Sequence, residues 1–338
     1  MRIGIVCALV AVLATIFAPQ NSLWAPWILD AVVESVSGRR LRLAHAWTPL
    51  DANPTPPRKI RILDGAALCR GAPAELDLSA PLLIRNVTSA RDLLSAPALM
   101  RPPLADLTVD YFFDASVARH LVPDARGTLG AVVANISRGH QHKLASQRIV
   151  SRAGCCAKPG ALEAFLEALV PACAADILGA VTPLGSRLGA AAHDLRLLTV
   201  PVFVSGANTR TDMHSEPIAS IALQLGGTKS WTLVPASASS RMRPRPSPDG
   251  RAYFYSELAD AEIVRVRERI AVTTVPGDAL WVPPWTWHRV TYDADDAAIS
   301  VAASLFHFRP LAFFTHNPPF ALAVFPNLLK EILGINTQ

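Results

Sequence analysis

The chain has 338 residues, of which 51% are apolar and only 17% are charged. This composition excludes an intrinsically disordered protein, and the length suits one large domain with extensions or two small ones. The net charge of +5 suggests a nucleic-acid-binding protein, but the basic residues are scattered among acidic ones. Their one dense cluster, Arg241 to Arg251, is rich in proline and has no interleaved aromatic residues before its final arginine. We therefore interpret the cluster as a solvated loop and expect no nucleic-acid partner.

The N-terminal segment is typical of a secretory signal. One basic residue, Arg2, precedes an uncharged, largely apolar run from Ile3 to Ala18, which is the layout of a signal sequence but is short for a membrane span. Residues 1–22 are predicted to be a signal peptide or an uncleaved signal anchor, with a buried N-terminal helix as the alternative. We expect the protein in the lumen of the secretory pathway (ER or Golgi), secreted, or attached to its membrane through this segment.

Two further features agree with a secretory route. Asn86 and Asn135 each begin an Asn-X-Ser/Thr sequon, a pattern that is also common by chance. Outside the signal segment the chain has an even number of cysteines, which an oxidising lumen could pair in more than one way: Cys69, Cys155, Cys156 and Cys173. Their connectivity stays open, and the absence of a C-x-x-C spacing argues against a structural zinc site.

Residues 23–58 are mixed in composition and end in a proline-rich stretch, which predicts a linker or variable segment. Between Leu162 and Val181 the apolar spacing predicts two short helices, interrupted by a proline. From Leu197 onward, many short apolar runs end at glycine and proline turns, which predicts a mainly β fold with flanking helices, either an antiparallel barrel or a jelly roll. Residues 311–338 are expected to form a C-terminal helical extension.

One apolar stretch carries charged groups that need a partner. His214, Glu216 and Lys229 lie in a run that otherwise predicts two buried strands joined at a Gly-Gly turn. Residues two apart in a strand point to the same face, so the imidazole of His214 and the carboxylate of Glu216 project together. Farther along, the segment PGDALWVPPWTWH delivers His288. Two imidazoles and one carboxylate are the ligand set of non-haem Fe(II) oxygenases, and a zinc site with three protein ligands is also chemically possible.

The order of these motifs resembles the JmjC and cupin-like family of Fe(II)- and 2-oxoglutarate-dependent oxygenases. "HSE", "GTK" and "PGDALWVPPWTWH" stand in the family's order, and "APLLIRNV" is similar to a strand near the start of such domains. The resemblance covers residues 59–310 and implies a double-stranded β-helix. It also implies that His214, Glu216 and His288 hold Fe(II).

The same resemblance implies a role for two more residues and an activity. Lys229 stands where the family places the lysine that pairs with the distal carboxylate of 2-oxoglutarate, and Thr211 is able to donate a hydroxyl to that cosubstrate. The implied activity is hydroxylation of a protein side chain or a small molecule. The oligomeric state stays open.

Several alternatives stay open at this level. Lys229 would snorkel to solvent if it lay on an edge strand without a cosubstrate. Ser220 stands where several relatives have an asparagine, which favours a catalytically weak or inactive metal-binding module of the same fold. A cupin metalloenzyme that uses no 2-oxoglutarate is the third hypothesis. Trp281, Trp285 and Trp287 are candidates for the walls of the site, with core packing as the alternative for two of them. His140 and His142 are expected at the surface and His307 in the core.

Overall fold

The computed structural model describes residues 24–37, 40–43, 47–70, 77–87, 94–113, 123–155, 198–247, 251–292 and 299–332. The predicted signal segment and the two helices predicted between Leu162 and Val181 lie outside these ranges, as do Cys156 and Cys173. No helix within them is both long enough and apolar enough to cross a membrane.

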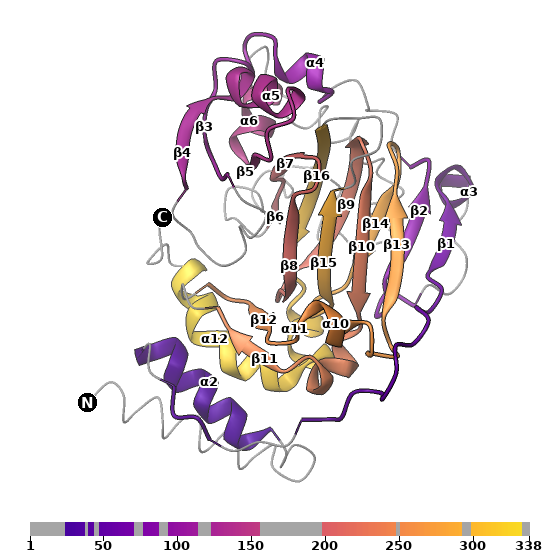
Figure 1. The fold of residues 1–338 in the computed structure, drawn as a ribbon, viewed down its shortest axis with the longest axis vertical. Coiled ribbons are helices and arrows are strands. Elements are labelled where there is room, and N and C mark those ends of the chain that lie inside the picture. Colours follow the sequence, from indigo (N-terminus) through magenta and orange to yellow (C-terminus); the bar gives the residue numbers. More distant parts are fainter. Residues whose placement is uncertain are drawn as a thin grey trace.

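The larger of two facing sheets has eight strands, and β9 lies near its centre (Figure 1). The strand order is β1 (Arg61–Asp64), β2 (Leu82–Arg85), β14 (Ala279–Val282), β9 (Ala219–Gly226), β16 (Ile299–His307), β7 (Val202–Gly206) and β5 (Lys143–Ser146), with β6 (Leu198–Thr199) beside β16. Strand β9 is buried along nearly its whole length because both of its faces are covered. Ile221 and Leu223 pack against a cluster that includes helix α5 (Leu129–Ser137), and Ala222 faces the second sheet.

The second sheet has six strands and carries most of the polar motif residues. Its order is β11 (Pro244–Pro246), β12 (Phe254–Ser256), β8 (Arg210–Ser215), β15 (Trp287–Tyr292), β10 (Lys229–Val234) and β13 (Ile270–Thr274). A separate two-stranded sheet pairs β3 (Thr108–Tyr111) with β4 (Ala125–Thr128). Apolar side chains from both large sheets, including Leu83, Leu233 and Leu280, form the core between them.

From β7 to β10 and again from β13 to β16, successive strands alternate between the two large sheets, which is the winding of a jelly roll. Strands β7, β9, β14 and β16 belong to the larger sheet, and β8, β10, β13 and β15 belong to the smaller. The predicted fold class, mainly β with flanking helices in a double-stranded β-helix, is confirmed.

The predicted Gly-Gly turn joins two strands that do not pair with each other. Strand β9 ends at Gly226 in the larger sheet and β10 begins at Lys229 in the smaller one, so the turn is a corner between sheets. Gly227 has φ +63°, and a Cβ there would lie 2.6 Å from the carbonyl oxygen of Ile299. Only glycine satisfies both the backbone angle and the close approach.

The linker predicted for residues 23–58 is wrong over Ala25–Ser37, which forms helix α2. Trp27 and Ile28 of this helix are buried against helix α12, and Figure 1 shows α2 (indigo) beside α12 (yellow). The proline-rich end is also anchored, since Thr48 and Thr55 donate backbone hydrogen bonds to Ser240 and Val264. Composition misled here because the helix is short and its apolar face is covered by residues distant in sequence.

The remaining helices close the ends of the sheets. The predicted terminal helix is α12 (Pro318–Ile332), which follows α11 (Pro310–His316) and packs with α2 around Phe254 and Phe320. The short helices are α3 (Gly65–Arg70), α4 (Ala96–Leu99), α6 (Arg148–Cys155), η3 (Ala236–Arg241) and α10 (Asp260–Ile263). Helices α4, α5 and α6 gather at one end of the molecule and α2 and α12 at the other (Figure 1).

Candidate metal centre

Strand pairing brings together the two histidines that lie far apart in the sequence. His214 and His288 are directly opposite each other in the antiparallel pair β8 and β15, so their side chains project to the same side of the sheet. Glu216 follows the end of β8, and its carbonyl accepts a hydrogen bond from the backbone N–H of Trp285 at 2.7 Å. The loop before β15 therefore holds the residue that carries the carboxylate.

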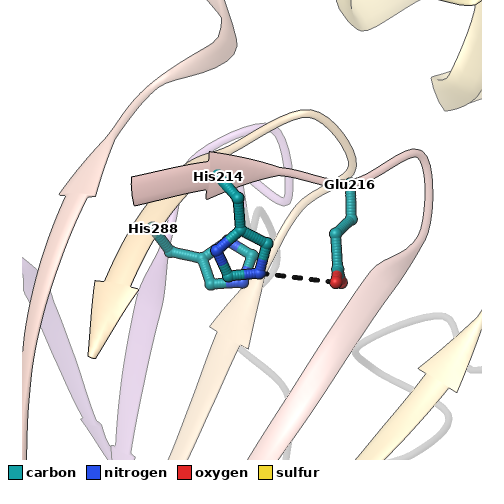
Figure 2. Close-up of side chains that lie close together, drawn as sticks. All are labelled: His214, Glu216 and His288. Atoms are coloured by element: carbon teal, nitrogen blue, oxygen red, sulfur yellow. Dashed lines mark ion pairs between the residues drawn. The ribbon is translucent and has the colours of Figure 1, made fainter. Parts of the chain in front are cut away.

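The three predicted ligands converge in the structure (Figure 2). One ligand atom from each of His214, Glu216 and His288 lies within 4.8 Å of the other two. The Nε2 atom of His214 is 3.4 Å from Oε1 of Glu216, and the two imidazole centroids are 4.1 Å apart. Adjacent donors bound to one ion at about 2.1 Å are about 3 Å apart, so small side-chain rotations would complete a site.

The hydrogen bonds of the imidazoles leave the correct nitrogens free for a metal. Nδ1 of His214 lies 2.8 Å from the carbonyl oxygen of Asp212, and Nδ1 of His288 lies 3.0 Å from that of Thr286. A carbonyl oxygen only accepts, so Nδ1 carries the hydrogen in both rings and Nε2 presents a lone pair. In His214 that lone pair faces the carboxylate of Glu216, and a cation between them relieves the repulsion.

Electrostatics keep the carboxylate and the second imidazole in their ligand forms. Burial raises the pKa of Glu216, but His214, which donates to the carboxylate only when its ring is doubly protonated, and the charges of His288 and Arg251 outweigh burial and lower the pKa to about 2. Burial is also the main cause that lowers the pKa of His288 to about 4, with a smaller contribution from His214. At neutral pH the site therefore offers a carboxylate and a neutral imidazole, the forms that bind divalent metals.

The three ligands line a cavity of about 270 Å³ between the sheets. Besides them, its walls are Ala145, Pro201, Phe203, Thr211, Ser220, Lys229, Trp231, Arg251, Val282, Val290, Tyr292, Ser304 and Phe306. Most of this surface is apolar, with a few polar groups that converge on the interior. That combination is typical of a small-molecule site.

Lys229 forms no ion pair with a carboxylate of the residues that the structure describes. Its side chain is buried, and its ammonium lies 5.4, 5.8 and 5.0 Å from the ring centroids of Phe203, Trp231 and Tyr292. Burial, with a smaller contribution from the charge of Lys143, lowers the pKa of Lys229 to about 7. Lys229 lies on β10, between β13 and β15, so it is not the snorkelling lysine of an edge strand. It offers a cation to a ligand in the cavity.

A β-bulge turns Thr211 toward the same cavity. The register of β8 against β15 pairs His214 with His288 but Thr211 with Val290, so β8 carries one extra residue between the two pairs. Residues three apart in a regular strand face opposite sides, and the bulge restores a common side for Thr211 and His214. Both of the predicted cosubstrate residues thus line the cavity that holds the metal ligands.

A family model described as a cupin-like domain matches residues 128–310, more than half of the chain. The chain belongs to the cupin-like domain family. The resemblance inferred from the ordered motifs is confirmed at this level, while dependence on Fe(II) and 2-oxoglutarate stays a prediction. The comparison with curated proteins found no matching relative. Strands β1 and β2 precede the matched residues and still belong to the larger sheet.

The three tryptophans expected near the site of this cupin-like domain do not line its cavity. The side chains of Trp281, Trp285 and Trp287 are fully buried in the core, and each indole N–H donates to a group outside the cavity walls. The backbone of Trp285 is tied to the strand of His214, since Ser215 donates a hydrogen bond to the carbonyl of Trp285. The tryptophan that does line the cavity is Trp231.

Sequence reasoning missed several other cavity residues, and strand alternation contained the signal for some of them. His288, Val290 and Tyr292 are spaced by two along β15 and all line the cavity, as do Lys229 and Trp231 along β10. The same rule that paired His214 with Glu216 predicts these positions. Arg251 also lines the cavity, and its guanidinium lies 4.4 Å from the ring centroid of Tyr253. No spacing rule would have found Arg251.

The Pro-Gly-Asp turn of the cupin-like domain has a structural role, because its aspartate links two strands of the larger sheet. Gly277 has φ +99°, and Asp278, buried in the core, accepts a hydrogen bond from the backbone N–H of Val275 at 2.9 Å. Asp278 also pairs with Arg85, the arginine of the "APLLIRNV" strand. Two of the sequence motifs therefore bind each other and fix β14 beside β2.

Three other histidines for which the structure gives a position, His140, His142 and His307, lie outside the cavity walls. His140 is exposed, and its ring stacks on that of His142 at a centroid distance of 5.1 Å, as expected for a surface pair. His307 is fully buried beside Trp281, which agrees with the predicted core position.

Proposed function

We propose that this cupin-like protein is an Fe(II)- and 2-oxoglutarate-dependent oxygenase that hydroxylates its substrate. The observation that carries the proposal is the presence, in one cavity, of the convergent His214, Glu216 and His288 and of the buried ammonium of Lys229. The first three residues suit a divalent metal. Lys229 suits an anion bound next to that metal.

The ligand set fits Fe(II). His214, Glu216 and His288 would hold the metal with two neutral imidazoles and one carboxylate, the ligand set of non-haem Fe(II) oxygenases, in which positions on the metal stay open. Bound together, Fe(II) and 2-oxoglutarate would supply the activation of O₂, with oxidation of the cosubstrate to succinate and CO₂ accompanying hydroxylation of a C–H bond. The chain contributes the fixed orientation of His214 and His288 through Asp212 and Thr286.

The cavity also fits a small dicarboxylate. Lys229 provides a cation and Thr211 a hydroxyl, and the aromatic rings of Phe203, Trp231 and Tyr292 surround the ammonium and exclude water. A charge pair between Lys229 and a carboxylate is stronger in such a dry site than in water. This requirement for an anion favours a cosubstrate-dependent enzyme over a cupin metalloenzyme that uses none.

The size of the cavity bears on the substrate. The volume of about 270 Å³ lies just below the range that is usual for ligand sites, about 300–1,000 Å³. It suits the cosubstrate together with one inserted group, such as a protein side chain or the end of a small molecule. Arg251 lines the cavity and would select a substrate group that is neutral or acidic.

A module that binds metal without turnover is the second candidate. Ser220 is the feature that favours it, because this short side chain lines the cavity where several relatives carry an asparagine. Ser304, from the neighbouring strand, supplies a second hydroxyl to the same cavity. Measured turnover decides between the two candidates.

The full chain is first loaded with Fe(II) under anaerobic conditions. Oxygen is then admitted, and the test measures whether oxygen uptake is coupled to succinate release. We expect uptake that depends on 2-oxoglutarate, absent in His214→Ala and strongly reduced in Lys229→Met. Metal binding should be lost in the first variant and kept in the second. Cosubstrate binding without turnover in any substrate library would favour the non-catalytic module, and metal binding without cosubstrate binding would favour the third hypothesis.

We further propose that the protein works in the lumen of the secretory pathway or at its membrane. The two sequons differ in the structure: Asn86 is exposed in a turn, whereas Asn135 lies half-buried in α5 and accepts a hydrogen bond from Arg138. In a secretory host, we therefore expect a glycan on Asn86 and little or none on Asn135. Unmodified protein recovered from the cytosol would contradict this localisation.

A further inference from the structure

A second buried lysine lies beside the cavity, and the proposed function leaves it without a role. Lys143 belongs to β5, at the edge of the larger sheet, and its side chain is buried. It is not a wall residue of the cavity. Its charge nevertheless reaches the cavity, because it lowers the pKa of Lys229.

Lys143 reaches across from the larger sheet to β8 of the smaller one. Its ammonium donates a hydrogen bond to the carbonyl of Arg210 and another to the hydroxyl oxygen of Thr211, both at 2.7 Å. The ammonium also lies 5.8 Å from the ring centroid of Tyr292. Lys143 therefore contacts one wall residue by hydrogen bond and a second through its ring.

These contacts determine what the Thr211 hydroxyl can do. An ammonium only donates, so the oxygen of Thr211 accepts from Lys143 and keeps its own hydrogen for another partner. A bound anion and the side chain of Tyr292, which also lines the cavity, are the neighbours that Thr211 faces on the cavity side. Lys143 thereby orients Thr211 as a donor toward the cavity.

Fold stability gives little reason for a lysine at this position. Burial lowers the pKa of Lys143 to about 7, only partly opposed by the charge of Asp212, so the folded chain keeps a cation where an apolar side chain would fit more favourably. The neighbouring cation of Lys229 adds repulsion. Buried groups whose pKa is strongly shifted next to a ligand cavity are typical of functional sites.

We propose that Lys143 is a positioning residue, which raises the affinity of the cavity for 2-oxoglutarate by orienting the hydroxyl of Thr211 toward the anion without touching it. This inference rests on the proposed function. It assigns the two lysines different tasks: Lys229 pairs with the carboxylate, and Lys143 acts through Thr211. A direct action of the Lys143 charge on the anion is the competing explanation, and it predicts a different mutational pattern.

The test is a double-mutant cycle on the full chain, loaded with Mn(II) as a redox-stable metal and titrated calorimetrically with 2-oxoglutarate. We expect Lys143→Met and Thr211→Val each to weaken binding about tenfold, the loss of one hydrogen bond to a charged group. The double variant should bind no more weakly than either single variant, because both changes remove the same donor. Mn(II) affinity should be unchanged in all three.

The variant Lys143→Gln distinguishes orientation of the Thr211 hydroxyl from a direct effect of the Lys143 charge. It also serves as a second variant if Lys143→Met does not fold. Its amide keeps N–H donors on the side of Arg210 and Thr211 but carries no charge, so we expect an affinity within about threefold of wild type. Equal losses in Lys143→Gln and Lys143→Met, multiplicative losses in the double variant, or unchanged affinity in Lys143→Met would each overturn the inference. Wild-type protein that binds no 2-oxoglutarate would overturn the proposed function with it.

Discussion

Replacing Lys229 with methionine should make the protein more stable and at the same time remove its cosubstrate. Methionine has nearly the length of lysine and an apolar end, so it fills the space among Phe203, Trp231 and Tyr292 without a buried charge. The ammonium has no acidic partner among the described residues, so the variant breaks no ion pair there. The two effects have opposite signs, which distinguishes a functional lysine from a structural one.

The lowered pKa sets the size of the stability effect. At pH 7 the unfolded chain holds Lys229 fully protonated, while the folded pKa of about 7 leaves the group half protonated. With about 1.4 kcal/mol for each pKa unit, the folded state is penalised by on the order of 4 kcal/mol at pH 7 and on the order of 2 kcal/mol at pH 9. The sign follows because the unfolded state binds more protons, so stability rises with pH over this range. Lys229→Met removes that pH dependence.

The assays are thermal melting without ligand and calorimetric titration with 2-oxoglutarate. We expect a melting temperature at least about 4 °C higher at pH 7, with a smaller gain at pH 9, and an affinity at least about 30-fold weaker. Lys59→Met, at an exposed lysine, is the matched control and should change neither quantity. A variant that melts below wild type at pH 7, or that binds 2-oxoglutarate equally well, would refute the assignment of Lys229 as an anion-binding cation.

Three further outcomes follow from the contacts of single residues. Affinity for 2-oxoglutarate should fall as pH rises through 7, by about tenfold per unit above pH 7.5, because the free Lys229 loses the proton that the anion requires; calorimetry in buffers of different ionisation enthalpy should show proton uptake. Asp278→Ala should lower the free energy of unfolding by about 2–3 kcal/mol, since it leaves the N–H of Val275 and the guanidinium of Arg85 without their carboxylate. Trp27→Ala should cost about 3–5 kcal/mol in denaturant unfolding because its indole is buried, whereas a flexible linker at this position would show no change.

The amino-acid sequence predicted a mainly β fold from its turns and short apolar runs, and the family resemblance of its motifs then favoured the jelly roll and the residues most directly tied to chemistry. Glycine and proline turns between short apolar runs report local backbone geometry, which does not depend on distant partners. The pair His214 and Glu216 followed from the two-residue period of a strand. The ordered motifs then added His288, Lys229 and Thr211, and the cavity contains all five of these residues.

Long-range pairing decided the rest. The register of β8 against β15 places His214 opposite His288, and the extra residue in β8 turns Thr211 inward, against the alternation that a regular strand would impose. Helix α2 was not predicted from its linker-like composition, because its burial depends on α12, nearly three hundred residues later in the chain. Lys143 had no local signal at all, since its hydrogen bonds reach a strand of the other sheet. Spacing along a chain predicts which side chains share a face, but which faces meet depends on the packing of the whole fold.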